Sequence, residues 1–296
     1  MHTRRFASSA ILAVAALFAP ACSTADSAPP VATIALAVSK PSVAIGSPLD
    51  LKYRFDVAPN ATIPGDYRVF VHVLDDRGAQ MWTDDHDPPK PTSTWRGGET
   101  VEYTRTRFIP SFPFLGPATI VAGLYRDNDR LPLQGRDPAD RESGTRAYVV
   151  ANLEILPQID NLTPWRKSGW HPVEFAPSNP ALDWEWTEKL ATLSFKNPKK
   201  DVTFYLEYDA RPDIFGDKPQ QVDIMIGGQT VHSFSASEKD VALLRIPISA
   251  AQLGTGEMTE LLLGVDRTFV PAQQAGGGRD SRELGIRVYH TFVEVR

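Results

Sequence analysis

The densest group of side chains that could do chemistry is the stretch Asp84-Asp85-His86-Asp87. Carboxylates that converge on a loop can hold a hard cation such as Ca²⁺ through their oxygens, and Asp127 and Asp129 of a later turn could join them in space. The Asp-x-[Asp/Asn]-x-[Asp/Asn]-Gly spacing of a known calcium loop is absent. Turn chemistry alone also explains aspartate here, because its side chain bonds to the backbone of turns. We therefore expect no cofactor, with Ca²⁺ at these aspartates as the alternative.

Asp84, Asp85 and Asp87 are also the residues on which an enzyme would depend. In that alternative the protein is an extracytoplasmic hydrolase that uses them as acidic catalytic groups. The nucleophile elbow Gly-x-Ser-x-Gly and the zinc motif His-Glu-x-x-His are both absent. His72, in an expected strand, is interpreted as a hydrogen-bonded histidine of the core or sheet face. We name no catalytic residue and favour a protein that is not an enzyme.

Aromatic side chains are a better indication of function than the aspartates. Sugars present apolar C–H faces that stack on flat rings, with polar groups nearby to hold the hydroxyls. Trp184 and Trp186 are two residues apart and hence on one side of an expected strand, whereas Trp82 and Trp95 lie in loops or at strand ends. Tryptophan is also a large hydrophobe that fills cores and plugs their ends. A ligand-binding role for these four rings therefore competes with simple packing.

The composition argues against some binding partners and excludes some kinds of covalent and metal site. A formal net charge of −5 argues against a general nucleic-acid binder, which needs a basic face. A single cysteine excludes an internal disulfide and a cysteine-based zinc site. The 296 residues suit two domains, and 25 prolines with 20 glycines are natural for many short strands joined by turns.

The first residues have the order of an export signal: basic, then apolar, then small. Arg4 and Arg5 precede the uncharged run 6–18, which is shorter than the roughly 20 residues that span a bilayer. The run ends in Phe18-Ala19-Pro20-Ala21-Cys22, with the only cysteine of the chain. This ending resembles the lipobox of bacterial lipoproteins, although Ala19 stands where leucine is usual. Ordinary cleavage near Ala19-Pro20-Ala21 is the alternative.

The lipoprotein resemblance implies a signal peptide over 1–21 and a lipid on Cys22, which becomes the first residue of the mature chain. Residues 22–31 are small, polar and proline-bearing, and are expected to form a tether. The protein would then be a lipid-anchored member of the cell envelope. In a Gram-negative host, Ser23 after the cysteine favours the outer membrane, on its periplasmic side or on its surface.

Residues 32–157 are predicted to form an immunoglobulin-like β-sandwich. Leu51, Tyr53, Phe55 and Val57 alternate with charged residues, which is the period of a strand with one buried face. Other expected strands are 32–38, 67–74, 101–108, 118–125, 131–133 and 146–156. Seven or eight short strands joined by turns are typical of such a sandwich.

A set of short motifs in this half carries a second resemblance. They are Phe70-Val71-His72-Val73-Leu74-Asp75, Asp85-His86-Asp87-Pro88, Thr94-Trp95-Arg96-Gly97-Gly98-Glu99, Gly123-Leu124-Tyr125 and Arg130-Leu131. In this order they resemble the extracytoplasmic C-terminal β-sandwich of bacterial membrane glycosyltransferases of the mannosyltransferase type, over about residues 45–156. No multispanning catalytic part accompanies them here. The resemblance therefore implies a fold and an association with envelope glycans, and no transferase activity.

The second half is predicted to be another all-β domain, a jelly-roll-like sandwich over 181–296. A proline- and tryptophan-rich segment, 158–180, is expected to link it to the first domain. Gly227-Gly228 between two strands predicts a hairpin, and 250–253 suit one helical turn. The expected strands are 191–195, 202–208, 221–226, 230–234, 241–248, 260–265 and 284–295.

These observations favour a non-catalytic cell-envelope lipoprotein of two β-sandwich domains. It would bind a polysaccharide, or a partner protein of glycan export or assembly, and would not bind nucleic acid. The extracytoplasmic hydrolase and a structural scaffold between envelope proteins remain the alternatives.

Overall fold

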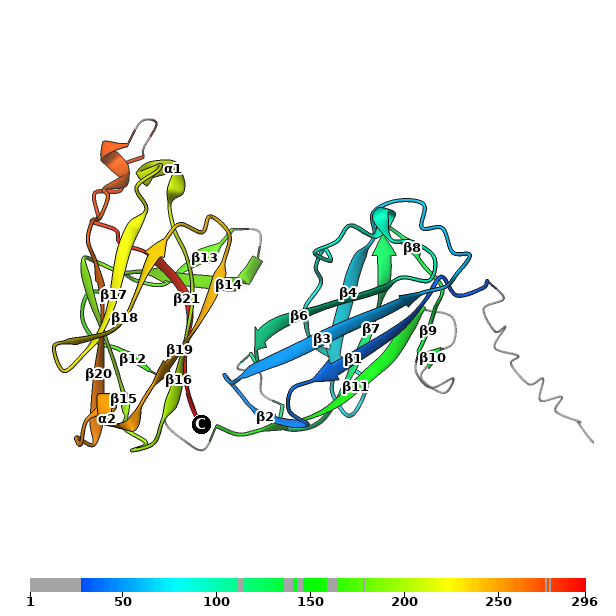
Figure 1. Cartoon of the computed structure of the whole chain (residues 1–296), viewed down its shortest axis with the longest axis horizontal. Helices are drawn as coiled ribbons and strands as arrows, with labels where there is room; N and C mark the ends of the chain where they lie inside the picture. Colours follow the sequence, from blue (N-terminus) through cyan, green and yellow to red (C-terminus); the bar gives the residue numbers. More distant parts are fainter. Residues whose placement is uncertain are drawn as a thin grey trace, which may run out of the picture.

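The computed structural model describes residues 28–110, 114–135, 141–142, 146–158, 164–177, 179–274, 276 and 278–296. Strands dominate these residues and form two separate β-sandwiches, so the all-β prediction is confirmed (Figure 1). Within the described ranges, none of the helices has the length and apolar character needed to cross a membrane.

The first sandwich consists of a four-stranded and a seven-stranded sheet. The smaller sheet has the order β6 (Thr100–Phe108), β3 (Pro48–Val57), β1 (Ala32–Val38), β9 (Leu133–Gln134). The larger has the order β10 (Arg141–Glu142), β11 (Ala147–Leu156), β7 (Gly116–Arg126), β4 (Arg68–Leu74), β5 (Gln80–Thr83), with β2 (Ser42–Ala44) beside β11 and β8 (Asp129–Arg130) beside β7.

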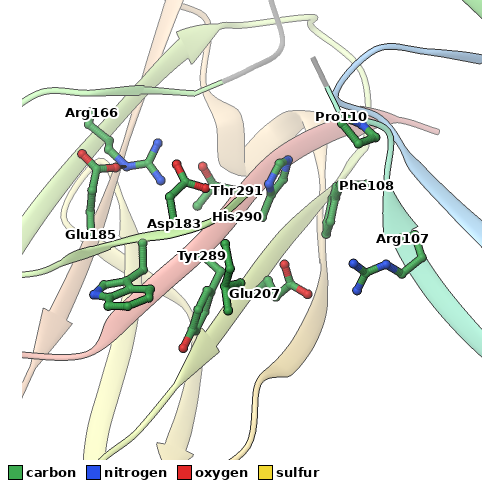
Figure 2. Close-up of a pocket in the computed structure, with 12 residues that line it drawn as sticks. Arg107, Phe108, Pro110, Arg166, Asp183, Glu185, Glu207, Tyr289, His290 and Thr291 are labelled. Atoms are coloured by element: carbon green, nitrogen blue, oxygen red, sulfur yellow. Dashed lines mark ion pairs between the residues drawn. The ribbon is translucent and has the colours of Figure 1, made fainter. Parts of the chain in front are cut away.

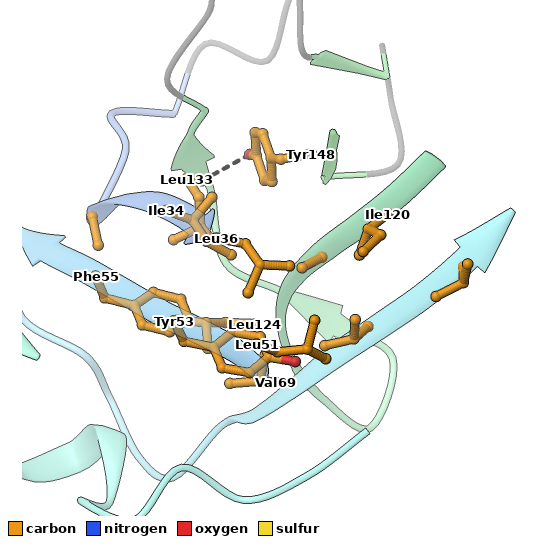
Figure 3. Packing of buried hydrophobic residues seen from close by; sticks show 14 of the residues in the cluster. Ile34, Leu36, Leu51, Tyr53, Phe55, Val69, Ile120, Leu124, Leu133 and Tyr148 are labelled. Atoms are coloured by element: carbon orange, nitrogen blue, oxygen red, sulfur yellow. Dashed lines mark hydrogen bonds between the residues drawn. The ribbon is translucent and has the colours of Figure 1, made fainter. Parts of the chain in front are cut away.

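Alternation along β3 explains how the first core forms. Leu51, Tyr53 and Phe55 are fully buried, whereas Lys52 and Arg54 between them are exposed. The buried side chains pack against residues of the facing sheet (Figure 3). Each large apolar side chain buried in this way contributes about 1.5–3 kcal/mol. The alternation that the sequence shows therefore decides which face of β3 turns toward the core, and the burial of that face contributes much of the stability of the strand.

The second sandwich consists of two five-stranded sheets. One has the order β12 (Trp165–Arg166), β15 (Leu190–Lys196), β20 (Met258–Val265), β17 (Gln220–Ile226), β18 (Gln229–Ala236). The other has the order β13 (Glu174–Ala176), β14 (Asn179–Trp186), β21 (Arg287–Val295), β16 (Val202–Asp209), β19 (Ala242–Ile248). The short helices are α1 (Pro212–Phe215) and α2 (Ala250–Leu253), with 3₁₀ turns η1 (Thr92–Thr94) and η3 (Pro271–Gln273).

Two details of the second half agree with the sequence and one differs. Gly227 and Gly228 have φ of 57° and 78°, which a two-residue hairpin between β17 and β18 requires. The single turn α2 is capped by Ser249, which forms a capping box with Gln252. The segment 158–180 is not a linker throughout, because β12 pairs with β15 and β13 pairs with β14. Residues 165–166 and 174–176 are therefore strands of the second sandwich.

The two sandwiches meet where the end of β6 reaches the outer face of β16, β19 and β21. Tyr205 lies on that face, since its neighbours in β16 belong to the core, and Phe108 contacts it edge-on at 6.1 Å between ring centroids. Arg245 Nη2 lies 2.6 Å from Asp50 Oδ1, and Lys40 pairs with Glu294. Aromatic and ionic contacts thus join the two halves of the chain.

Candidate functional site

A cleft of about 480 Å³ lies at the junction of the two sandwiches (Figure 2). Its size falls among ligand pockets, which are about 300–1,000 Å³. The first sandwich contributes the end of β6 and the residues after it, and the second contributes β12, β14, β16 and β21. The lining residues are Arg107, Phe108, Pro110, Arg166, Leu182, Asp183, Trp184, Glu185, Glu207, Tyr289, His290 and Thr291.

An aromatic cluster around Arg287 forms one wall of the cleft. The guanidinium carbon of Arg287 lies 4.8 Å from the ring centroid of Trp184, 5.5 Å from that of Trp186 and 5.3 Å from that of Tyr289. Trp184 and Tyr289 meet edge-on at 6.0 Å. Trp184 Nε1–H donates to Glu174 Oε2 at 3.1 Å. Trp184 and Tyr289, the two rings that line the cleft, are therefore fixed by contacts with Arg287 and with each other, and Trp184 also by its hydrogen bond to Glu174.

The buried carboxylate of Asp209 fixes this cluster in place. Arg287 Nε–H donates to Asp209 Oδ1 at 2.8 Å, and the Tyr289 hydroxyl donates to Asp209 Oδ2 at 2.8 Å. Burial, together with this hydrogen bond, raises the pKa of Tyr289. The phenol therefore stays neutral at physiological pH, and the ring keeps a defined orientation toward the cleft.

A second polar group lies at the edge of the second sandwich. Arg166 of β12 pairs with Glu185 of β14. Burial lowers the pKa of Arg166 and raises the pKa of Glu185. Asp183, on the same strand, is exposed. These charges come from β12 and β14, which belong to different sheets, so the pair also closes the open edge of the sandwich.

Glu207 and His290 form the part of the floor nearest the first sandwich. Burial raises the pKa of Glu207, although Arg107 and Arg105 oppose that shift. Burial lowers the pKa of His290 to about 4, so this imidazole is neutral at neutral pH. Across the residues with assigned positions, neither Asp183 nor Glu207 has a hydrogen-bonding or ion-pair partner. Arg107 and Arg105 act on Glu207, and Arg166 on Asp183, only through the electrostatic field, so both carboxylates keep free hydrogen-bond acceptors in the cleft.

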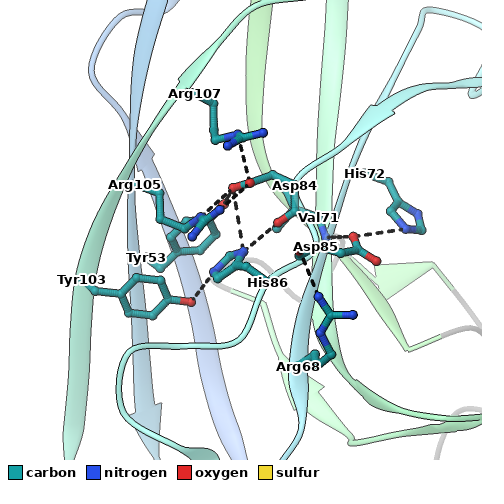
Figure 4. Close-up of polar contacts among 10 residues, drawn as sticks. All are labelled: Tyr53, Arg68, Val71, His72, Asp84, Asp85, His86, Tyr103, Arg105 and Arg107. Carbon is teal, nitrogen blue, oxygen red and sulfur yellow. Dashed lines mark hydrogen bonds and ion pairs between the residues drawn. The ribbon is translucent and has the colours of Figure 1, made fainter. Parts of the chain in front are cut away.

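The aspartates that the sequence singled out lie in the first sandwich, and the neighbours Asp84 and Asp85 point in different directions (Figure 4). Asp84 is buried and accepts hydrogen bonds from Tyr53, at 3.2 Å, and from Arg105, at 2.9 and 3.1 Å. Arg107 Nε lies 3.1 Å from Asp84 Oδ1. His86 Nδ1–H donates to the Asp84 carbonyl at 2.6 Å. Asp84 therefore serves a buried polar network, which reaches the cleft through Arg107.

The other aspartates have separate partners. Asp85 accepts from the Val71 amide at 3.0 Å and lies 3.8 Å from His72, while Asp87 pairs with Arg68 at the surface. Asp129 accepts from Tyr67 at 2.5 Å, and Asp127 occupies the turn between β7 and β8 with φ of 54°. In the described part of the chain no three His, Cys, Asp or Glu side chains gather as metal ligands would. The structure does not bring these five aspartates together into a Ca²⁺ site.

Of the four tryptophans, only Trp184 lines the cleft. Trp95 is 4% exposed, packs on Phe55 at 5.0 Å and donates to the Lys90 carbonyl. Trp186 is 6% exposed, and the half-buried Trp82 packs on the first core. Packing therefore accounts for the other three rings.

Sequence reasoning missed Asp183, Glu207, Tyr289 and His290 as site residues. They come from three strands that are distant in the chain, and no local motif joins them. The only indication was their place beside Trp184 or in expected strands. Cys22 lies outside the described residues.

No family model matches the sequence, and no curated protein matches it either. Three similar solved structures are the Pseudomonas fluorescens alkylpurine DNA glycosylase AlkC bound to DNA containing an abasic site analog, a Bacteroides uniformis beta-glucuronidase, and CBM51-2 in complex with GlcNAc and INT domains from Clostridium perfringens ZmpB. Their identities are 13%, 10% and 9%, and their TM-scores 0.22, 0.30 and 0.25. The matches cover 43%, 88% and 88% of this chain but 30%, 30% and 40% of those chains. The chain thus spans less than half of each, and likeness at these scores carries no argument about function.

Proposed function

We propose that this protein is a non-catalytic lipoprotein of the cell envelope whose interdomain cleft binds a segment of polysaccharide. The observation that carries the proposal is the juxtaposition of two fixed aromatic rings, Trp184 and Tyr289, with two carboxylates in one cleft. Asp183 and Glu207 supply these carboxylates, and neither makes a hydrogen bond to a described residue. Ring faces suit the apolar faces of sugars, and carboxylate oxygens accept hydrogen bonds from hydroxyl groups.

The concave shape of the site supports a polysaccharide over a partner protein. A protein partner is usually bound by a larger and flatter surface, burying about 800 Å² on each side. The cleft is instead of the size that encloses a small number of sugar rings. Its acidic groups, like the overall charge of −5, are unsuited to nucleic acid.

The buried position of Asp84 does not support the hydrolase alternative. Its side chain is 2% exposed and already accepts from Tyr53 and two arginines. A general acid or base must reach the proton that it transfers, through a direct contact or one water. Asp84 offers no such access, so we assign it a structural role.

The location forms part of the same proposal. Export by residues 1–21, lipidation of Cys22 and a tether over 22–31 would hold both sandwiches outside the cytoplasm, at the outer membrane of a Gram-negative host. A Cys22→Ser chain followed by membrane fractionation tests this arrangement. The variant should leave the membrane pellet, and retention in the pellet would contradict the anchor.

Binding to immobilised envelope polysaccharides tests the function. The full chain, purified in detergent, should bind without releasing products. Trp184→Ala should weaken binding about tenfold, the value of one stacked ring. Trp82→Ala removes a half-buried indole outside the cleft and is the matched control. Equal loss in both variants, or no binding by the native chain, would refute the assignment of the cleft.

A further inference from the structure

The two arginines that line the cleft are already committed to acidic partners. Arg107 Nε lies 3.1 Å from the buried Asp84 Oδ1, and Arg166 pairs with Glu185. Arg166 also lies over the Trp170 ring, 5.1 Å from its centroid. A ligand anion could bind these arginines only by competing with carboxylates that are fixed in the fold. Neither guanidinium therefore provides an open anion site.

The remaining charge that faces the cleft is negative. Asp183 and Glu207 line it from β14 and β16, and each lacks an ion-pair partner throughout the described ranges. His290 between them and the first sandwich is neutral at neutral pH, because burial lowers its pKa to about 4. Asp183 and Glu207 thus add negative charge to the cleft. Arg107 and Arg105 partly offset that charge at Glu207, and the rings of Trp184 and Tyr289 lie close by.

We propose that the cleft selects glycans with free, protonated amino groups over N-acylated and anionic glycans. This inference rests on the proposed function and names the class of sugar that the same site takes. An ammonium group donates charge-assisted hydrogen bonds to carboxylates and is attracted to aromatic ring faces. A uronic acid or phosphate group would meet like charges in a partly desolvated site, which disfavours binding.

Calorimetry with three tetrasaccharides tests the inference. The full chain would be titrated with the tetramers of glucosamine, N-acetylglucosamine and galacturonic acid at about pH 6, where an amino group is protonated. The glucosamine tetramer should bind at least about tenfold more tightly than the other two, as expected for one charge-assisted hydrogen bond. Equal or tighter binding of either other tetramer, lost in Trp184→Ala, would overturn the amino-group selectivity and leave the glycan site intact.

Substitution of the carboxylates separates selectivity from binding. Asp183→Asn with Glu207→Gln should abolish the preference for glucosamine. The glucosamine tetramer should lose more affinity than the N-acetylated tetramer, because the amide oxygens of the variant still accept hydrogen bonds from hydroxyl groups but no longer attract an ammonium group. Glu188→Gln removes an exposed carboxylate of the same sandwich, outside the cleft, and should leave the preference unchanged. A preference that survives the double substitution would overturn the assignment to these carboxylates. Absence of binding by all three tetramers, with binding to the envelope polysaccharides retained, would overturn the inference alone. Absence of both would overturn the proposed function as well.

Discussion

Phe108 of the first sandwich stacks on His290 of the second, with ring centroids 4.1 Å apart and an interplanar angle of 25°. Both residues line the cleft, so the contact that joins the sandwiches also forms part of the site (Figure 2). The stack buries the imidazole in its neutral form. The shape of the cleft therefore depends on how firmly this contact holds.

Phe108→Ala should loosen the junction without unfolding either core. Loss of a half-buried ring and its stacking should cost about 1–2 kcal/mol. The increase in radius of gyration measured by solution scattering reports the loosening. Met258→Ala removes a side chain that is 41% exposed in β20, which belongs to the other sheet of the second sandwich and does not line the cleft, and should change neither scattering nor stability. An unchanged radius of gyration in Phe108→Ala would show that other contacts fix the domains.

His290 should make stability fall as the pH is lowered. Its pKa is about 4 when folded, against 6.5 for the free side chain. Between these values the unfolded chain binds more protons than the folded one, so stability is lost as pH falls through the window. The loss should be on the order of 2 kcal/mol after discounting for partial exposure. Urea titrations of native chain and His290→Gln across this window measure it, since the variant should lose less.

Glu207 should make stability fall as the pH is raised, which is the opposite of the effect of His290. Burial raises its pKa in the folded state, so folding binds protons more tightly and ionised Glu207 destabilises the protein above both pKa values. Glu207→Gln should therefore raise the unfolding free energy at neutral pH by up to about 1 kcal/mol, with a smaller difference at acid pH. Glu188→Gln serves as the exposed control. A variant less stable than native at neutral pH would contradict this account.

Asp84→Asn should be strongly destabilising. The change removes the carboxylate that Arg105 and Arg107 share in a buried setting, which typically costs about 3–5 kcal/mol. Asp87→Asn breaks only a surface pair with Arg68 and should cost less than about 1 kcal/mol. Thermal melts of both variants provide the comparison. Similar melting temperatures would argue against the buried network.

Much of the fold could be predicted from local patterns, whereas the site could not. The alternation in β3 and the paired glycines at 227–228 each specify structure through near neighbours. Asp84 and Asp85 are adjacent, yet one enters a buried network and the other faces His72, because neighbouring side chains leave an extended chain on opposite sides. The expected linker failed for a related reason: its short strands are recognisable only through distant partners in β14 and β15.

The cleft depends even more on residues that are distant in the sequence, so local patterns could not predict it. Phe108, Trp184, Glu207 and His290 come from four strands, and only the pairing of β14, β21 and β16 with the docking of β6 brings them together. Neither the composition nor the spacing of residues indicates that β6 contacts the second sandwich. Trp184 could be singled out because aromatic residues are informative alone, but Glu207 is one of many glutamates until its burial is known.

The ten-residue strand β3 also sets how far the cleft would stand from a bilayer. Pro48 at one end of β3 pairs with Phe108 beside the cleft, and Val57 at the other end pairs with Ala32, where β1 begins. These ends are separated by roughly 30 Å of extended chain. Under the lipid anchor proposed above, the acyl chains on Cys22 would be joined to the end of the first sandwich that is remote from the cleft, where β1 begins. The first sandwich would act as a stalk, and the reachable sugars would be those of polymer strands well clear of the lipid headgroups.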